Sequence, residues 1–354
     1  MKWMNQLTRL FNIEYPVIQA PMFGVTTPAM VVAATRANCL GSLSLGDLNA
    51  TGCSEAIRAT KQLTGDPFAV NIFVHKIPAL TNELSARYTK TRHFIETFAL
   101  QHHLLVKLPA IDEVKLNSYH EQVEVIIEEG CKMLSFTFGN LDQQSIDRLK
   151  SKGICLIGTC TSVEEAMILE ASGIDVICVQ GIEAGGHRGS FEETNILQIG
   201  GLSLLAQVYD KVKVPLIYAG GIYNASTLLA AKTLGAQGFQ VGSLLIASAE
   251  SSLKDFEKQR LKKVNEKDIV LTKSFSGRYA RGINNTFIET IESSEYVLPY
   301  PYQNKLTAEL RKVAKEQKNA DFVNIWAGQS LFRYSEHSTS EILRKLISDV
   351  ELFS

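Results

Sequence analysis

The chain lacks a strong charge of either sign. Its 36 lysines and arginines nearly balance 37 aspartates and glutamates, which gives a formal net charge of -1 over 354 residues. No stripe of basic residues runs along the sequence. Since nucleic acids and anionic membranes attract proteins through such a positive excess, the composition gives no reason to expect either as a partner.

Long apolar runs and paired cysteines are also missing. No run approaches the roughly 20 apolar residues that a membrane span needs, and the N-terminus lacks the apolar core and cleavage site of a secretory signal. The six cysteines form no C-x-x-C pair, and several lie in apolar runs where a thiol acts as a small hydrophobic side chain. We therefore expect unpaired cysteines in a cytoplasmic protein.

Short apolar runs alternate with helical patterns through most of the chain. Eight of these runs have the continuous hydrophobic character of buried parallel strands, and a helical segment follows nearly every one. They lie at residues 17–20, 41–44, 68–73, 131–139, 153–159, 175–180, 214–222 and 238–243. Because no G-x-G-x-x-G follows the first strand, we favour an α/β fold with a (β/α)8 barrel, a TIM barrel, over an open dinucleotide-binding sheet.

The repeat is interrupted once and then stops. We predict that residues 1–73 and 131–248 form the barrel, and that 74–130 is a largely helical insertion on the third strand-to-helix loop. The composition changes at 249–354, where a highly charged helical stretch precedes more mixed segments. We expect this C-terminal region to pack as helices over the mouth of the barrel, together with the insertion.

A glycine-rich stretch from Gly181 to Gly189 contains one imidazole, His187, directly after a predicted strand. Ligands of such barrels lie at the carboxyl ends of the strands, where this chain has few acids and no second histidine. A lone histidine is usually structural, but this position favours a catalytic His187, whose ordinary pKa of about 6.5 suits proton exchange near neutrality. The other histidines make no metal-ligand spacing, so we expect no metal.

Two further features point to a phosphorylated heterocycle. The turns Gly220-Gly221 and Gly242-Ser243 suit phosphate binding through backbone N–H groups, although tight turns alone explain such glycines equally well. The amides of Asn71, Gln180 and Gln240 follow three strands and suit the mixed donors and acceptors of a heterocycle. Together these features favour FMN as the cofactor.

Several segments are similar to those of the nitronate monooxygenases, formerly called 2-nitropropane dioxygenases. The similar motifs are IQAPMFG, NIF, LSFTFG, QGIEAGGHRG, AGGI and QVGS, followed by FSGRYARG, PYPYQN and WAGQ, which resemble class I of the family. The resemblance implies a TIM barrel with a lid, non-covalent FMN and no metal. It implies a catalytic role for His187 and flavin contacts at Met22, Asn71, Gln180, Gly185, Gly221, Gln240, Val241, Gly242 and Ser243.

The resemblance also implies an activity. The enzyme would oxidise alkyl nitronates, such as propionate 3-nitronate, with O2 to a carbonyl compound and nitrite, through a flavin semiquinone. His187 would hold the anionic nitronate, most strongly when protonated, and could serve as a base for a neutral nitroalkane. Two alternatives are an NAD(P)H-dependent FMN reductase of the enoyl-acyl-carrier-protein reductase or quinone reductase type, and a non-catalytic barrel that binds a phosphorylated ligand. We expect a monomer or a homodimer.

The segment GRYARG at 277–282 allows two interpretations. Arg278 and Arg281 form either a surface turn or an anion clamp over the site. The sequence departs from the family pattern at two positions, where Ser243 replaces the common threonine and Tyr279 the usual proline. Either hydroxyl can donate to a phosphate, so Ser243 changes little, whereas Tyr279 leaves the size of the substrate open.

Overall fold

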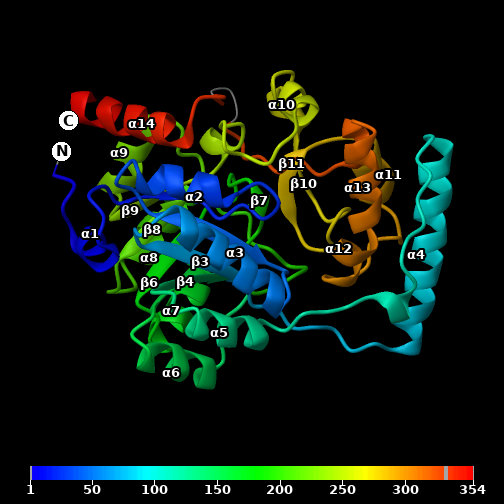
Figure 1. Cartoon of the computed structure of the whole chain (residues 1–354), viewed down its shortest axis with the longest axis horizontal. Helices are drawn as coiled ribbons and strands as arrows, with labels where there is room; N and C mark the ends of the chain where they lie inside the picture. Colours follow the sequence, from blue (N-terminus) through cyan, green and yellow to red (C-terminus); the bar gives the residue numbers. More distant parts are fainter. Residues whose placement is uncertain (1, 331–333, 354) are drawn as a thin grey trace.

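The computed structural model describes residues 2–330 and 334–353. Eight parallel strands form the sheet β1-β9-β8-β6-β5-β4-β3-β2, and Leu40, which directly precedes β2, exchanges hydrogen bonds of 2.9 Å with Val17 and Gln19 of β1. The strands are β1 (Val17–Gln19), β2 (Gly41–Gly46), β3 (Phe68–Phe73), β4 (Met133–Thr137), β5 (Cys155–Cys160), β6 (Val176–Gln180), β8 (Leu216–Ala219) and β9 (Gly238–Val241). The predicted α/β class and (β/α)8 barrel are confirmed (Figure 1).

Helices surround these strands. They are α2 (Pro28–Thr35), α3 (Ala50–Leu63), α5 (Tyr119–Glu128), α6 (Gln143–Ser151), α7 (Val163–Ala171), α8 (Gly201–Tyr209), α9 (Ala225–Thr233) and α14 (Thr339–Phe353). The start of α2 follows the sequence closely, because the Thr27 side chain accepts the backbone N–H of Met30 and Pro28 occupies the first helical position. Inside the barrel, Leu7 and Phe11 of α1 (Gln6–Phe11) pack against the inward side chains of the strands and close its amino end.

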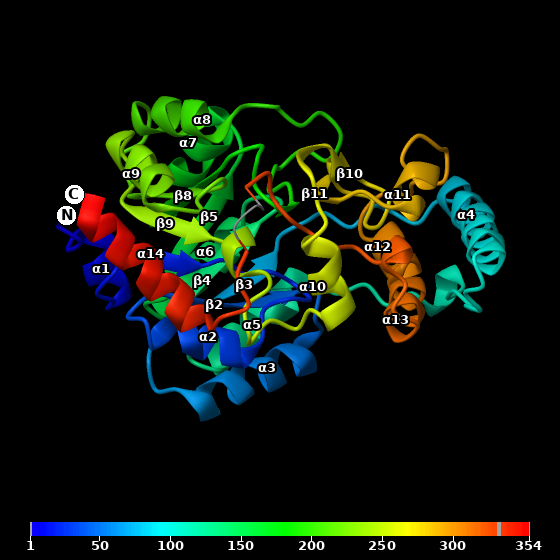
Figure 2. The ribbon, with the colours of Figure 1, turned by 90° about the horizontal axis from the view of Figure 1, so that it is seen from above.

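A second body, which we call the lid, has its own core. It contains α4 (Asn82–Gln101), η1 (Ile111–Glu113), α10 (Asp255–Leu261), η3 (Glu266–Asp268), β10 (Ile269–Thr272), β11 (Ala280–Ile283), α11 (Thr286–Ile291), α12 (Tyr302–Leu306), α13 (Ala308–Glu316) and η4 (Ala320–Phe322). In both views α4 lies at the outer edge of the lid, far from α1 and α14 (Figures 1 and 2). Tyr88 and Ile95 of α4 share the lid core with Phe275, Phe287 and Phe322, so the insertion and the C-terminal region fold together.

Two helices lie outside the predicted domain boundaries. Helix α5, which the prediction places in the insertion 74–130, packs on α3, α6 and β3, and its Ile126 lies in the barrel core. Helix α14, which the prediction places over the mouth, packs on α2 and α9, and its Leu343 lies in the same core. Each helix therefore completes a βα unit of the barrel, and the inserted segments run from 74 to 118 and from β9 to α14.

Two further observations concern long apolar helices and the cysteines. Among the described residues, no helix is both long and apolar enough to cross a membrane. All six cysteines are unpaired, and only Cys155 is partly exposed. Burial raises the pKa of Cys53 to about 11, which keeps that thiol protonated near neutrality.

Candidate functional site

A cavity of about 550 Å³ lies between the carboxyl ends of the barrel strands and the lid. Its size is typical of sites for small molecules, which span roughly 300–1,000 Å³. The structure brings nine of the predicted site residues to its walls: Met22, Asn71, Gln180, Gly185, His187, Gly221, Gln240, Gly242 and Ser243. The tenth, Val241, does not line it, because strand alternation turns this side chain into the fully buried core between strands and helices.

The lid holds the loop that carries His187. The two-residue strand β7 (Gly186–His187) pairs antiparallel with β11 of the lid, where His187 lies opposite Ala280. Close approach makes Gly185 necessary, since a Cβ atom there would lie 2.4 Å from the backbone nitrogen of Gly328. The histidine is thus positioned by the three-stranded sheet β10-β11-β7, which no local sequence pattern predicts.

Gln180 has a structural role that its position in the sequence does not reveal. Its Nε2 donates to the carbonyl of His187 at 3.0 Å, and its Oε1 accepts the backbone N–H of Gly189 at 2.8 Å. The amide therefore braces the histidine loop with its oxygen and one N–H, and its second N–H makes no hydrogen bond to a described residue. Asn71 donates to Ser135 Oγ at 2.9 Å, whereas the Gln240 side chain makes no hydrogen bond to any described residue. Of the three amides, Gln240 is the one with all its donors and acceptors available to a ligand.

The imidazole of His187 sits among aromatic rings. Its centroid lies 5.5 Å from those of Phe138 and Trp326 and 6.2 Å from that of Phe73. Burial, and secondarily the positive charges of Arg278 and Arg311, lower the pKa of His187 to about 3. The ring is therefore neutral at pH 7, and a negative charge beside it would favour the protonated form.

The backbone near the last two strands presents free donors. Gly220 and Gly221 have φ angles of +129° and +66°, conformations that glycine adopts readily. The N–H groups of Gly221 and Ser243 make no hydrogen bond within the described part of the chain. Ser243 Oγ accepts the N–H of Gly328 at 2.8 Å, so its own proton remains available to an anion. These groups form a cradle that fits a phosphate.

Neither interpretation of the GRYARG segment is correct. Arg278 and Arg281 are only 1% and 7% exposed, which excludes a surface turn, and neither lines the cavity. Arg278 pairs with Glu193 at 3.0 Å and stacks over Phe138 at 4.3 Å, while Arg281 Nε donates to the carbonyl of Ile182 at 2.9 Å. Both arginines therefore bind the segment around the histidine loop to the lid.

Tyr279 likewise points away from the site. It does not line the cavity, and Lys273 Nζ lies 5.0 Å from the centroid of its ring. Its carbonyl accepts the backbone N–H of Arg188 at 2.7 Å. The side chain of Tyr279 therefore does not limit the size of a bound molecule.

Sequence reasoning missed the cationic wall, which we define as Lys305, Arg311, Lys312 and Lys315 of α12 and α13. Three of these cations have carboxylate partners: Lys305 with Asp47 at 2.6 Å, Lys312 with Glu309 at 3.1 Å and Lys315 with Glu257 at 3.2 Å. Arg311 forms no ion pair within the described residues and donates to oxygens of Asn304 and Thr307. The i, i+4 spacing of Arg311 and Lys315 indicates that the two cations share one face of a helix, but it does not tell whether that face meets the cavity.

Burial lowers the pKa of Arg311 to about 10, which leaves it charged at pH 7. The wall thus holds four cations against three carboxylates, an excess of one positive charge. Since the surrounding protein screens charge less than water does, this excess favours a negatively charged group in the cavity.

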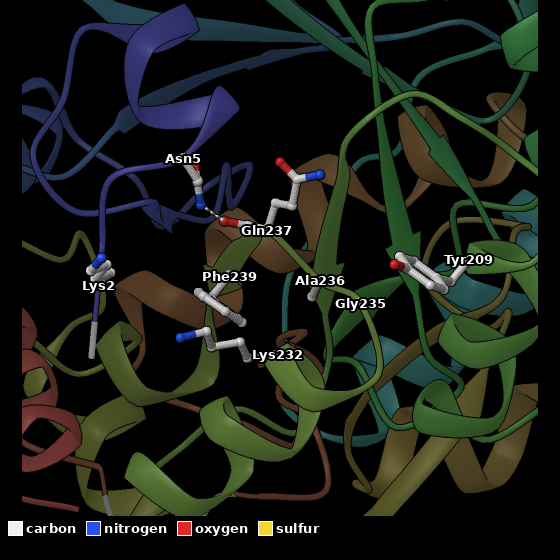
Figure 3. A pocket seen from close by; sticks show the side chains of 8 residues that line it. All are labelled: Lys2, Asn5, Tyr209, Lys232, Gly235, Ala236, Gln237 and Phe239. Atoms are coloured by element: carbon white, nitrogen blue, oxygen red, sulfur yellow. Dashed lines mark hydrogen bonds between the residues drawn. The ribbon is translucent and has the colours of Figure 1, made fainter. Parts of the chain in front are cut away.

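A smaller cavity of about 250 Å³ lies at the amino end of the barrel (Figure 3). Lys2, Tyr209 and Lys232 contribute to its walls, and Asn5 donates to the carbonyl of Gln237 at 2.7 Å. None of the predicted site residues lies there. Within the described residues, no group of three or more histidine, cysteine, aspartate or glutamate side chains is arranged to hold a metal ion.

Comparison with known proteins gives consistent matches. The profile of the nitronate monooxygenase family matches residues 4–349. A probable nitronate monooxygenase of Staphylococcus aureus (strain Newman) is 37% identical over 349 residues, which cover 98% of this chain and 97% of that protein. Nitroalkane oxidase from Streptomyces ansochromogenes superposes with a TM-score of 0.88 at 32% identity, over 98% of each chain. FabK from Thermotoga maritima, with a TM-score of 0.76, 24% identity and coverage of 99% and 97%, shares the fold.

Proposed function

The chain belongs to the nitronate monooxygenase family, and from that premise we propose that it uses FMN to oxidise alkyl nitronates, such as propionate 3-nitronate, with O2 to a carbonyl compound and nitrite. The family makes the protein a flavin-dependent oxidoreductase. The observation that carries the finer proposal is one cavity in which a phosphate cradle, the free amide of Gln240, His187 and an excess positive charge meet.

The cavity fits FMN in its donor set. The free N–H groups of Gly221 and Ser243 would hold the phosphate, and the Gln240 amide would bind the edge of the heterocycle. Met22, Asn71, Gly185 and Gly242 would complete the contacts, and Gln180 would add its second N–H while it braces the histidine loop. When bound, FMN would supply the electron transfer between nitronate and O2.

The charge of the wall supports an anionic substrate. Propionate 3-nitronate carries two negative groups, and Arg311 is the wall cation without a carboxylate partner among the residues that the structure describes. A carboxylate beside Arg311 would complete its charge-assisted hydrogen bonds. Arg311 and His187 both line this cavity, so the two groups can act on different ends of one small molecule.

His187 would contact the reacting end of the substrate. As a neutral ring it can accept a proton, which suits a neutral nitroalkane, and the similar protein from Streptomyces ansochromogenes is named a nitroalkane oxidase. With an anionic nitronate bound, the negative charge would raise the pKa of His187 and favour its protonated, donating form. The same side chain can thus serve both forms of the substrate.

An anaerobic titration with propionate 3-nitronate tests the proposal. We expect the substrate to bleach the absorbance of the bound flavin, and nitrite to appear once air is admitted. A flavin that ignores the nitronate but is bleached by NADH or NADPH would instead indicate the reductase alternative. A colourless protein that does not take up FMN would indicate a non-catalytic barrel.

Location and assembly belong to the same proposal. Six unpaired cysteines suit the reducing cytoplasm, where we place the protein. Cell fractionation checks the location. We propose a monomer or homodimer, which light scattering after gel filtration distinguishes.

A further inference from the structure

The imidazole of His187 has one polar contact among the described residues. Its Nε2 lies 2.9 Å from Oγ of Ser276, a buried residue of the lid between β10 and β11. Nδ1 makes no hydrogen bond to any described residue, although the ring lines the cavity. Tyr300 packs nearby, but its hydroxyl has no partner among the described residues and so does not orient the ring. Ser276 is therefore the group that can decide which ring nitrogen carries the proton.

The hydroxyl of Ser276 donates its single proton to a backbone carbonyl of its own segment. Its Oγ donates to the carbonyl of Arg278 at 2.9 Å and accepts the backbone N–H of the same residue at 3.3 Å. No other described group donates to that carbonyl, and Arg278 is only 1% exposed. If the hydroxyl turned to donate to Nε2 of His187, the buried carbonyl of Arg278 would lose its hydrogen bond. This cost favours the tautomer of His187 with its hydrogen on Nε2 by roughly tenfold or more.

In the opposite arrangement, His187 Nε2, Ser276 Oγ and the carbonyl of Arg278 all have hydrogen-bond partners. His187 donates from Nε2 to Ser276 Oγ, and Ser276 donates to the Arg278 carbonyl. A neutral imidazole with its hydrogen on Nε2 has its lone pair on Nδ1. Since burial and, secondarily, the positive charges of Arg278 and Arg311 oppose a second proton, the ring stays in this neutral form.

We propose that Ser276 is a positioning residue that fixes His187 as the Nε2–H tautomer and leaves the Nδ1 lone pair available to the bound molecule. What that molecule is rests on the proposed function, but the tautomer does not. For a neutral nitroalkane, the α C–H bond breaks, its electron pair stays on the substrate as nitronate, and the proton forms an N–H bond at Nδ1. Ser276 then continues to accept from Nε2 in the imidazolium.

Nitrogen-15 NMR of histidine-labelled, flavin-loaded protein tests the tautomer at pH 7, with His187→Asn used to assign the signals. We expect the His187 proton on Nε2 in the wild type. In Ser276→Ala the ratio of Nε2–H to Nδ1–H forms should fall by roughly tenfold, and Ser276→Thr, which keeps the hydroxyl, should restore it.

Ser274→Ala is the matched control. Ser274 is a buried serine of the same segment, but its hydroxyl bonds to Glu292 and Thr272 and not to His187. It should therefore leave the tautomer ratio unchanged. A wild-type ring protonated on Nδ1, or a Ser276→Ala ratio equal to that of the wild type, would overturn the proposal.

Turnover supplies a second readout. Ser276→Ala should lower kcat for nitroethane by roughly tenfold and lower kcat for ethyl nitronate less, because only the neutral substrate must lose a proton to His187. Equal losses on both substrates would contradict a role through the Nδ1 lone pair. The NMR spectrum needs no turnover, so failure of the proposed function, seen as absence of nitrite, is distinguishable from failure of this inference.

Discussion

Replacing Arg311 by methionine removes the excess charge of the cationic wall. The wall holds four cations against three carboxylates, so Arg311→Met makes it neutral while leaving the three ion pairs in place. A charge-assisted hydrogen bond is worth about 1.5–3 kcal/mol, which corresponds to a loss of roughly 10-fold to 150-fold in kcat/KM for propionate 3-nitronate. Ethyl nitronate has no carboxylate, so its kcat/KM should change much less.

The ratio of the two kcat/KM values, measured by nitrite release, isolates this effect. Lys312→Met is the matched control because it removes the same single charge from the same wall and helix, but from a largely exposed lysine that is paired with Glu309, and it leaves Arg311 in place. It should alter the ratio less than about fivefold, as surface ion pairs contribute at most about 1 kcal/mol. Equal losses on both substrates with Arg311→Met would show that Arg311 does not contact the carboxylate, and would refute the reasoning.

Three further predictions concern the cofactor, the histidine loop and pH. Gln240→Leu should weaken FMN binding by roughly tenfold, because it removes an amide that bonds to no described residue; flavin fluorescence titration measures this, and an unchanged affinity would count against the assignment. Gly189→Ala would place a Cβ atom 2.6 Å from Oγ1 of Thr137, so we expect lower kcat and a lower Tm by calorimetry, and a variant with wild-type values would contradict the packing. The pKa of His187 is about 3 in the folded protein and about 6.5 when unfolded, so the unfolded state binds the extra proton first as pH falls. Between pH 7 and pH 5 this should cost the flavin-free wild type about 2 kcal/mol more than it costs His187→Asn, by urea unfolding, because His75, whose pKa burial lowers to about 4, contributes equally to both proteins.

Local sequence patterns were sufficient for the barrel and for the position of the site. Most strands are short apolar runs, and residues at or just past their carboxyl ends, such as Gln180, Gly221 and Gln240, line one cavity at that edge of the barrel. The sequence alone therefore assigns His187 and Gln240 to one cavity. The cap of α2 by Thr27 is equally local, because it depends on contacts three residues away.

The domain boundaries were harder to predict from the sequence than the barrel was. The apolar faces of α5 and α14 show that each helix is buried, but not against which core. Sequence separation misled the prediction for α14, since a segment of about a hundred residues lies between β9 and the helix that completes its βα unit. Amphipathic periodicity identifies a buried face and says nothing about its partner.

The chemistry of the site depends on contacts between distant residues, and these only the tertiary structure decided. Ser276 reaches His187 across 89 positions, and Arg278 reaches Glu193 across 85. The sequence by itself determined which residue types stand at the strand ends, because strand and helix periods are local properties of the chain. Whether Gln180 braces a loop, Arg278 clamps a segment or Arg311 stays without an ion pair among the described residues depends on burial and on partners brought together by folding, since hydrogen bonds and pKa values respond to neighbours in space.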